Sequence, residues 1–174
     1  MEDKGTRDVG FFEFLSEEER AEFARVVENT IFEPGEILIE EGAEPASLFV
    51  LLSGQVEVNK RVPGRSDRLL AVLEATDGRA IVGERGLLSD SEASATVRAK
   101  ERVEAVKMPR ERFQAMIREG RPAAYKLAYQ IARILAERIA RLDEEVVEVT
   151  REIERRGATD LDAFRDKLLT EWTI

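Results

Sequence analysis

The stretch Gly83-Glu84-Arg85-Gly86-Leu87-Leu88, followed closely by Ser94-Ala95-Thr96-Val97, decides the interpretation of this chain. Its first part predicts a loop that opens a short helix at Glu84, and its second part predicts a β-strand. A helix that begins at Glu84 would present backbone N–H groups and the positive end of its dipole to an anion. Glycines at 83 and 86 would allow close approach to the backbone.

Short β-prone segments surround this stretch and alternate with glycine-containing turns. The predicted strands are 37–39, 47–52, 55–60, 69–73, 94–99 and 103–108. Strands at this spacing predict an all-β sandwich or barrel. Ser53-Gly54 leaves so little room between two apolar runs that a tight hairpin is expected there. The polar residues 61–67 are expected to form a longer, exposed hairpin loop.

A helix is predicted before the β-segment. Ser16 followed by three glutamates is typical of a helix N-cap, so a helix is expected over about 16–29. Apolar residues just before it should dock it on a core, namely Phe11, Phe12, Phe14 and Leu15.

Further helices are predicted after the β-segment. Pro109 is expected in the first turn of a short helix that ends at Gly120. Pro122 opens a much longer helix that can run to about 156, where Gly157 would stop it. The apolar spacing within 160–172 predicts a short amphipathic helix.

The long helix carries an apolar seam in which residues step by 3, 4, 3 and 4: Ile139, Leu142, Val146, Val149 and Ile153. β-branched residues at the first heptad position, with a leucine at the fourth, favour a parallel two-stranded coiled coil. Earlier apolar residues supply a face for the β-domain: Leu127, Ile131, Ile134 and Leu135. A parallel homodimer is therefore predicted, with Leu135 at the edge of its interface. The alternative is that the seam packs on its own β-domain.

The composition excludes several kinds of chemistry. The chain of 174 residues has no cysteine, no histidine and a net charge of −9. Thiolate and imidazole zinc sites, iron–sulfur clusters, His-ligated haem and His-based catalytic triads are excluded, and the negative charge disfavours nonspecific nucleic-acid binding. No acid–base pair is distinguished by its spacing, so the protein is not expected to be an enzyme. Neither a membrane span nor a secretory signal is found, and a cytoplasmic location is expected.

The order of predicted elements resembles the cyclic-nucleotide-binding domain of the catabolite activator protein (Crp/Fnr-like) family over about 11–155. The motifs that carry the resemblance are Phe32-Glu33-Pro34-Gly35-Glu36, Leu48–Val56, Gly83–Leu88 and Ala95–Ala99. The resemblance implies a mainly β fold with flanking helices, in which a double-stranded β-helix (jelly-roll) barrel precedes a long C-terminal dimerisation helix. The expected domains are 1–120 for the barrel, 121–156 for the long helix and 157–174 for the short terminal helix.

The resemblance also implies a ligand site, with no catalytic residue and no metal, lined by Gly83, Glu84, Arg85, Gly86, Leu87, Ala93, Ser94 and Ala95. In the family, the residue at Glu84 accepts a hydrogen bond from the ribose 2′-hydroxyl, and amides near Gly86 and Leu87 meet the cyclic phosphate. An arginine at the position of Ala93 pairs with that phosphate. This chain has Glu92-Ala93 where the family usually has Pro-Arg.

The missing arginine is expected to weaken phosphate binding by roughly ten- to a hundredfold, since a charge-assisted bond contributes about 1.5–3 kcal/mol. Arg85 or Arg98 could replace it if either pointed inward. Strand alternation instead favours Val97 as the residue that faces in.

Two functions are compatible with these observations. The first is a stand-alone regulatory module that senses cyclic AMP, cyclic GMP or a related phosphate ligand, without a cofactor. The alternative is a dimeric scaffold with a vestigial pocket. Only 17 residues follow Gly157, too few for a helix-turn-helix, so DNA binding is not expected. The terminal helix could instead dock a protein partner through Phe164, Leu168 and Trp172.

Overall fold

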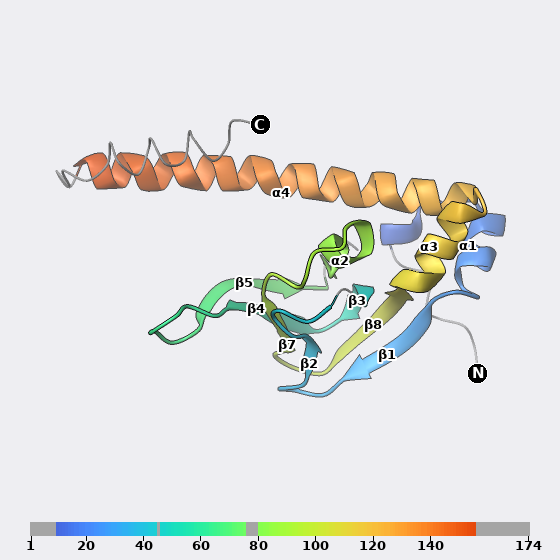
Figure 1. The fold of residues 1–174 in the computed structure, drawn as a ribbon, viewed down its shortest axis with the longest axis horizontal. Coiled ribbons are helices and arrows are strands. Elements are labelled where there is room, and N and C mark those ends of the chain that lie inside the picture. Colours follow the sequence, from blue (N-terminus) through green and yellow to red (C-terminus); the bar gives the residue numbers. More distant parts are fainter. Residues whose placement is uncertain (1–9, 45, 76–79, 156–174) are drawn as a thin grey trace. The chain divides into compact units, whose positions relative to one another are not determined.

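The computed structural model describes residues 10–44, 46–75 and 80–155. Within them, eight strands form two four-stranded antiparallel sheets with the orders β1-β8-β3-β6 and β2-β7-β4-β5 (Figure 1). The strands are β1 (Glu28–Phe32), β2 (Ile37–Ile39), β3 (Ser47–Ser53), β4 (Gln55–Lys60), β5 (Arg68–Glu74), β6 (Ile81–Val82), β7 (Thr96–Ala99) and β8 (Val103–Pro109). This architecture confirms the predicted mainly β, jelly-roll fold.

Two of the described helices precede the strands in the chain, one lies between β6 and β7, and two follow the strands. The helices are the 3-10 helix η1 (Gly10–Phe12) and the α-helices α1 (Glu17–Phe23), α2 (Glu84–Leu88), α3 (Arg110–Arg118) and α4 (Pro122–Arg155). None of the described helices combines the length and apolar character that crossing a membrane requires.

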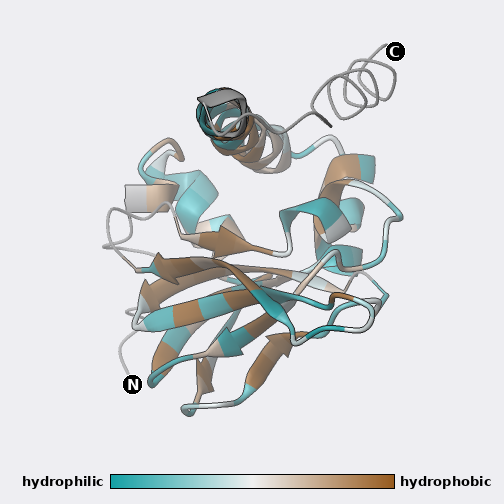
Figure 2. Ribbon diagram, turned by 90° about the vertical axis from the view of Figure 1, so that its left-hand side faces the viewer, coloured by the Kyte–Doolittle hydropathy of each residue, from teal (hydrophilic) through white to brown (hydrophobic). Residues whose placement is uncertain are grey.

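The core lies between the two sheets. Both sheets contribute buried side chains, among them Leu38, Phe49, Leu51, Val56, Val82, Val97 and Val103. Figure 2 shows apolar residues concentrated along the strands. In β7 the more and less buried side chains alternate, because alternate side chains of a strand point to opposite sides of the sheet.

Helix α1 has the predicted N-cap but ends earlier than predicted. The Ser16 hydroxyl accepts a hydrogen bond from the Glu19 N–H, and the Glu19 carboxylate accepts one from the Ser16 N–H, which completes a capping box. The prediction of a helix to about residue 29 is wrong, because α1 ends at Phe23 and β1 begins at Glu28. In β1, Thr30 pairs with Ala105 of β8. Antiparallel pairing with β8 therefore outweighs the helical periodicity there.

The predicted tight hairpin at Ser53-Gly54 is also wrong. β3 belongs to one sheet and β4 to the other, so the chain crosses between sheets at this point. Gly54 has φ = +85°, and a Cβ on it would lie 2.4 Å from the Arg102 carbonyl oxygen. The loop 61–67 does connect two antiparallel neighbours, β4 and β5, as predicted.

The C-terminal helices begin and end close to the predicted residues. Pro109 is the N-cap of α3 and the last residue of β8, not a first-turn residue of the helix as predicted. Gly120 follows α3 with φ = +69°, and Pro122 opens α4. The predicted helix within 157–174 lies outside the described residues.

The chain divides into two compact units, 1–131 and 132–174. The first unit buries three of the four residues that were expected to dock α1, since Phe11, Phe12 and Leu15 are at most 2% exposed, and Phe14 is half-buried. The same unit includes the first turns of α4, where Leu127 and Ile131 are fully buried. The second unit contains the rest of α4.

Candidate functional site

The predicted ligand site over residues 83–95, named the cassette, begins at a glycine that caps a short helix. Gly83 is the N-cap of α2 and has φ = +85°. A Cβ at this position would lie 2.3 Å from the Ser47 carbonyl oxygen of β3, so the close approach of α2 to β3 requires glycine. Glu84 begins α2 and is half-buried, as is Gly86, while Leu87 is buried and anchors the helix.

The second end of the cassette is held by backbone hydrogen bonds. The Gly42 N–H donates to the Ala93 carbonyl at 2.9 Å, and the Ala93 N–H donates to the Ala43 carbonyl at 2.9 Å. Ser94 is exposed and Ala95 is buried. These bonds fix the backbone at the position where the family has its phosphate-binding arginine, although this chain has alanine there.

The two cassette ends converge on residues 39–43. The Ile39 side chain lies 3.1 Å from the position of a Cβ on Gly83, and Gly42 and Ala43 bind Ala93. Both ends of the predicted site therefore lie beside the same segment of the chain, residues 39–43. Leu87 and Ala95 contribute to this site as buried supports, since little of either side chain is accessible.

Neither predicted substitute for the missing arginine faces the core. Arg98 is exposed and its Nη1 donates to the Gly35 carbonyl at 2.6 Å, whereas Val97 is 5% exposed. The predicted alternation in β7 is thus confirmed. Arg85 is exposed on α2.

A lysine–glutamate pair beside Ser94 was not predicted from the sequence. Lys60 Nζ donates to Glu41 Oε1 at 2.8 Å and to the Ser94 carbonyl at 2.6 Å. The Arg61 N–H donates to Glu41 Oε2 at 2.8 Å. The hydrogen bond from Lys60, and next that from Arg61, hold the pKa of Glu41 below its usual value. The pair places a cation at the second end of the cassette.

Arg110 is a second residue that the sequence did not reveal, and it supports the cassette from α3. Its side chain is 15% exposed and forms an ion pair with Asp90. Its Nη1 also donates to the carbonyl oxygens of Gly86 at 3.1 Å and Ser89 at 2.8 Å. Since a guanidinium can donate in several directions at once, Arg110 fixes the C-terminal end of α2 against α3.

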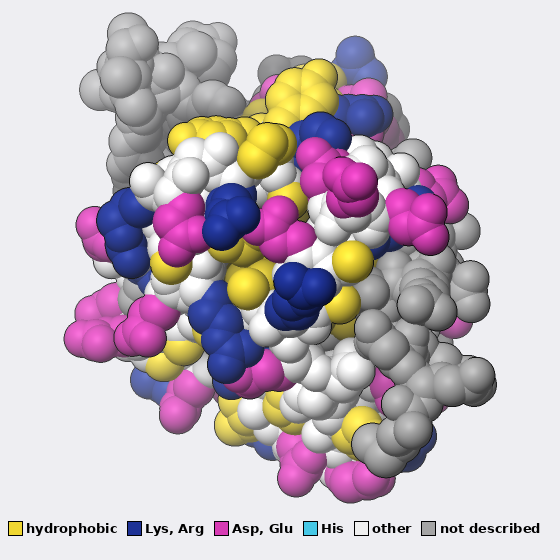
Figure 3. Space-filling model, turned by 90° about the vertical axis from the view of Figure 1, so that its right-hand side faces the viewer, with side chains coloured by type: hydrophobic (Ala, Val, Ile, Leu, Met, Phe, Trp, Pro, Cys, Tyr) yellow, Lys and Arg dark blue, Asp and Glu magenta, His cyan; other side chains and the backbone are white. Residues whose placement is uncertain are grey.

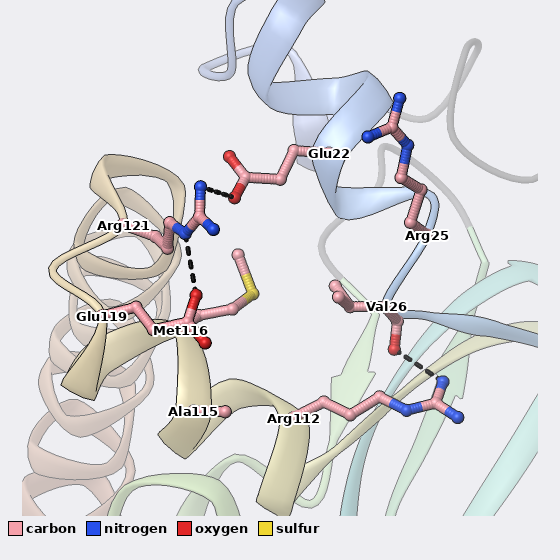
Figure 4. A pocket seen from close by; sticks show the side chains of 8 residues that line it. All are labelled: Glu22, Arg25, Val26, Arg112, Ala115, Met116, Glu119 and Arg121. Carbon is pink, nitrogen blue, oxygen red and sulfur yellow. Dashed lines mark hydrogen bonds and ion pairs between the residues drawn. The ribbon is translucent and has the colours of Figure 1, made fainter.

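A separate hollow of about 490 Å³ lies beside α3. It is lined by Glu22, Arg25, Val26, Arg112, Ala115, Met116, Glu119 and Arg121 (Figure 4). Basic and acidic side chains are interspersed over the face that Figure 3 shows. Arg121 pairs with Glu22 and Glu119, and Arg112 donates to the Val26 carbonyl. Most of the charged groups that line the hollow thus bind one another, and none of them belongs to the cassette.

The described residues hold no group of three or more carboxylates placed to bind a metal ion. Among the described residues, the cassette offers backbone amides and the carboxylate of Glu84, and the Lys60 ammonium group lies beside its second end.

Comparison with known proteins identifies the family. Residues 29–119 match the family described as the cyclic nucleotide-binding domain, and the chain belongs to that family. It is 32% identical over 111 residues to the cGMP-dependent protein kinase egl-4 of Caenorhabditis elegans, covering 63% of this chain and 14% of the kinase. It is 31% identical over 113 residues to the cyclic AMP receptor protein of Thermus thermophilus, covering 65% and 51% respectively.

A solved structure supports the same assignment. The Thermus thermophilus catabolite activator protein matches with a TM-score of 0.64 and 28% identity, over 86% of this chain and 72% of that one. The chain thus spans a small part of the kinase and about half of the cyclic AMP receptor protein. Residues 29–119, which match the family, contain α2, α3 and all the strands except the first residue of β1.

Proposed function

We propose that this protein is a regulatory domain that binds a cyclic nucleotide, cyclic AMP or cyclic GMP, between Gly83 and Ala95. The convergence of both cassette ends on residues 39–43 is the observation that carries this proposal. Family membership supports the ligand class. The names of two relatives refer to cyclic GMP and to cyclic AMP, so the ligand class extends to both nucleotides.

The ligand would be recognised mainly through its ribose. Glu84 is the residue that the family uses to accept a hydrogen bond from the 2′-hydroxyl, and a carboxylate is a strong acceptor for such a donor. Buried Leu87 and the Arg110 contacts hold α2 in place. Because this chain has alanine at position 93, the arginine contact to the phosphate is missing. Either another cation makes that contact or the affinity for the nucleotide is low.

The same proposal includes a homodimer formed through α4. The described seam residues Ile139, Leu142, Val146 and Val149 are 50%, 56%, 42% and 54% exposed. Leu135 is half-buried. Covering this stripe with the same stripe of a second copy removes apolar surface from water, which favours association. A ligand would then act by binding two states of α4 with different affinities.

Isothermal titration calorimetry with cyclic AMP and cyclic GMP tests the ligand proposal. We expect saturable binding to the wild type, weakened roughly ten- to a hundredfold in Glu84→Ala, since a charge-assisted hydrogen bond is lost. Glu101→Ala removes an exposed glutamate from the β7–β8 turn and should leave the affinity unchanged. Equal affinities in all three proteins would contradict the assigned role of Glu84.

The alternative function is a dimeric scaffold whose pocket binds no nucleotide. Ala93 favours it, because the backbone around this residue is intact while its phosphate-binding side chain is absent. In that case calorimetry would show no binding by the wild type, and Ala93→Arg would create it. Docking of a protein partner by the terminal helix, and the expected lack of DNA binding, stay predictions.

A further inference from the structure

The second end of the cassette contains a cation that is built into the fold. Lys60 reaches across from β4 so that its Nζ lies 2.6 Å from the carbonyl oxygen of Ser94. Ser94 directly follows Ala93, whose position carries the phosphate-binding arginine in the family. The positive charge that is absent from residue 93 is therefore present within a few ångströms of the same backbone.

Lys60 is the last residue of β4. In the same strand, Val56 is buried in the core between the sheets and Val58 packs partly buried against it. The register of β4 with β7 runs without a shift from Val56 to Asn59, whereas its register with β5 shifts between Val58 and Asn59. Alternation along β4 puts Lys60 on the same side as Val56 and Val58, and at the end of the strand its side chain is 43% exposed.

Lys60 has the capacity to bind a further acceptor. An ammonium group has three N–H donors, and the contacts with Glu41 and Ser94 use two. The Lys60 side chain is 43% exposed, so a ligand can reach it, whereas the Glu41 side chain is only 16% exposed. Glu41 is itself held by the Arg61 N–H.

The arginines near the cassette bind elsewhere or belong to its first end. Arg98 binds the Gly35 carbonyl, and Arg110 binds Asp90 and the carbonyl oxygens of Gly86 and Ser89. Arg85 lies on α2, at the first end of the cassette. Lys60 donates to a backbone atom at the second end, the Ser94 carbonyl oxygen.

We infer that Lys60 binds the phosphate of the ligand in place of the missing arginine, and that Glu41 is the internal counter-ion that holds Lys60 when no ligand is bound. This inference rests on the proposed function, since it assigns the phosphate contact within the same site. Glu41 then competes with the phosphate for Lys60, which makes the affinity lower than that of a site with a free cation.

Calorimetry on the full chain tests the inference with cyclic AMP, cyclic GMP and, as a probe without phosphate, adenosine. We expect Lys60→Gln to weaken binding of the cyclic nucleotides roughly ten- to a hundredfold and to leave adenosine binding unchanged. Lys60→Arg should retain binding of the cyclic nucleotides. Glu41→Gln should strengthen cyclic-nucleotide binding roughly two- to fivefold, because it frees the lysine.

The matched control is Lys107→Gln. Lys107 is also a strand lysine paired with a glutamate, Glu28 at 3.4 Å, but it lies in the other sheet. The Lys107→Gln variant should bind cyclic nucleotides with the affinity of the wild type. Thermal unfolding of each variant verifies that the fold is retained.

The outcomes separate this inference from the proposed function. Equal cyclic-nucleotide affinity in the wild type and Lys60→Gln would overturn the role of Lys60 while leaving the proposed function in place. If the wild type binds neither nucleotide, the proposed function fails, and Glu41→Gln then decides the inference. Binding gained in that variant, and lost again in Glu41→Gln/Lys60→Gln, would support Lys60 as the phosphate ligand. No binding in it would overturn the inference as well.

Discussion

At the scale of single residues, the geometry of the cassette depends most directly on Gly83. Its φ of +85° lies in the left-handed region, and a Cβ would approach the Ser47 carbonyl oxygen to 2.3 Å. Alanine there adds a backbone clash to the roughly 1–2 kcal/mol cost of the left-handed conformation. We expect Gly83→Ala to lower the free energy of unfolding by more than that cost and to weaken cyclic-nucleotide binding.

Gly64 provides the control for this substitution. It has φ = +74° in the exposed β4–β5 loop, and a Cβ on it would meet nothing within 4 Å. Gly64→Ala should therefore show the conformational cost alone. Urea denaturation compares the two variants, and equal losses of stability would show that the contact with Ser47 contributes nothing.

Gly83 and Glu84 could be predicted from the sequence, whereas Lys60 and Glu41 could not. The former are adjacent, and a glycine before a helix start is a local signal. Lys60 is 19 residues from Glu41 and 34 from Ser94. Their meeting depends on how β4 pairs with β7 and on how residues 42–43 bind Ala93, and neither contact has a local sequence signal.

At the scale of elements, α1 is tied to α4 by Glu19. Its Oε2 accepts hydrogen bonds from Lys126 Nζ and from the Ser16 N–H, each at 2.7 Å. The bond from Lys126, and next that from Ser16, lower the pKa of Glu19 from its ordinary 4.5. A group whose pKa is lowered by folding stabilises the protein above its unfolded-state pKa, and this contribution is lost as the pH falls through the folded-state pKa.

We therefore expect Glu19→Gln to lower the free energy of unfolding at pH 7, by at most about 1 kcal/mol because Lys126 is partly exposed. The difference from the wild type should shrink as the pH falls below 4.5. Glu18→Gln changes an exposed neighbour in the same turn and is the control. Urea denaturation at pH 7 and at pH 3–4 measures both, and a pH-independent difference for Glu19→Gln would contradict the ionic origin.

The elements that could be predicted were those with a strong local pattern. Strands β2 and β4 have the predicted bounds, since glycine-containing turns delimit them. Strand β1 was hidden by a helical spacing that continued past Phe23, and β6 has only two residues. The crossing between sheets at Gly54 resembles a hairpin locally, because the sheet to which each strand belongs is decided by distant partners.

At the scale of the whole molecule, the proposed homodimer depends on the exposed seam of α4. Its heptad spacing is readable from the sequence, and the exposure of its described residues agrees with that spacing. The side chain of Ile153 lies outside the described residues. The spacing predicts the apolar stripe itself but not the surface that packs against it, because that surface is formed by other residues. Two adjacent valines allow the question to be tested.

Val146 lies at the first heptad position of the seam and Val147 beside it at the second, and they are 42% and 48% exposed. Aspartate at 146 would bury a charge in the coiled-coil interface, whereas aspartate at 147 would remain in water. We expect sedimentation equilibrium at tens of micromolar to find a dimer for the wild type and for Val147→Asp, and a monomer for Val146→Asp. A monomeric wild type would contradict the dimer. The same mass for both variants would contradict its formation through the seam, because the two substitutions differ only in which side of α4 carries the charge.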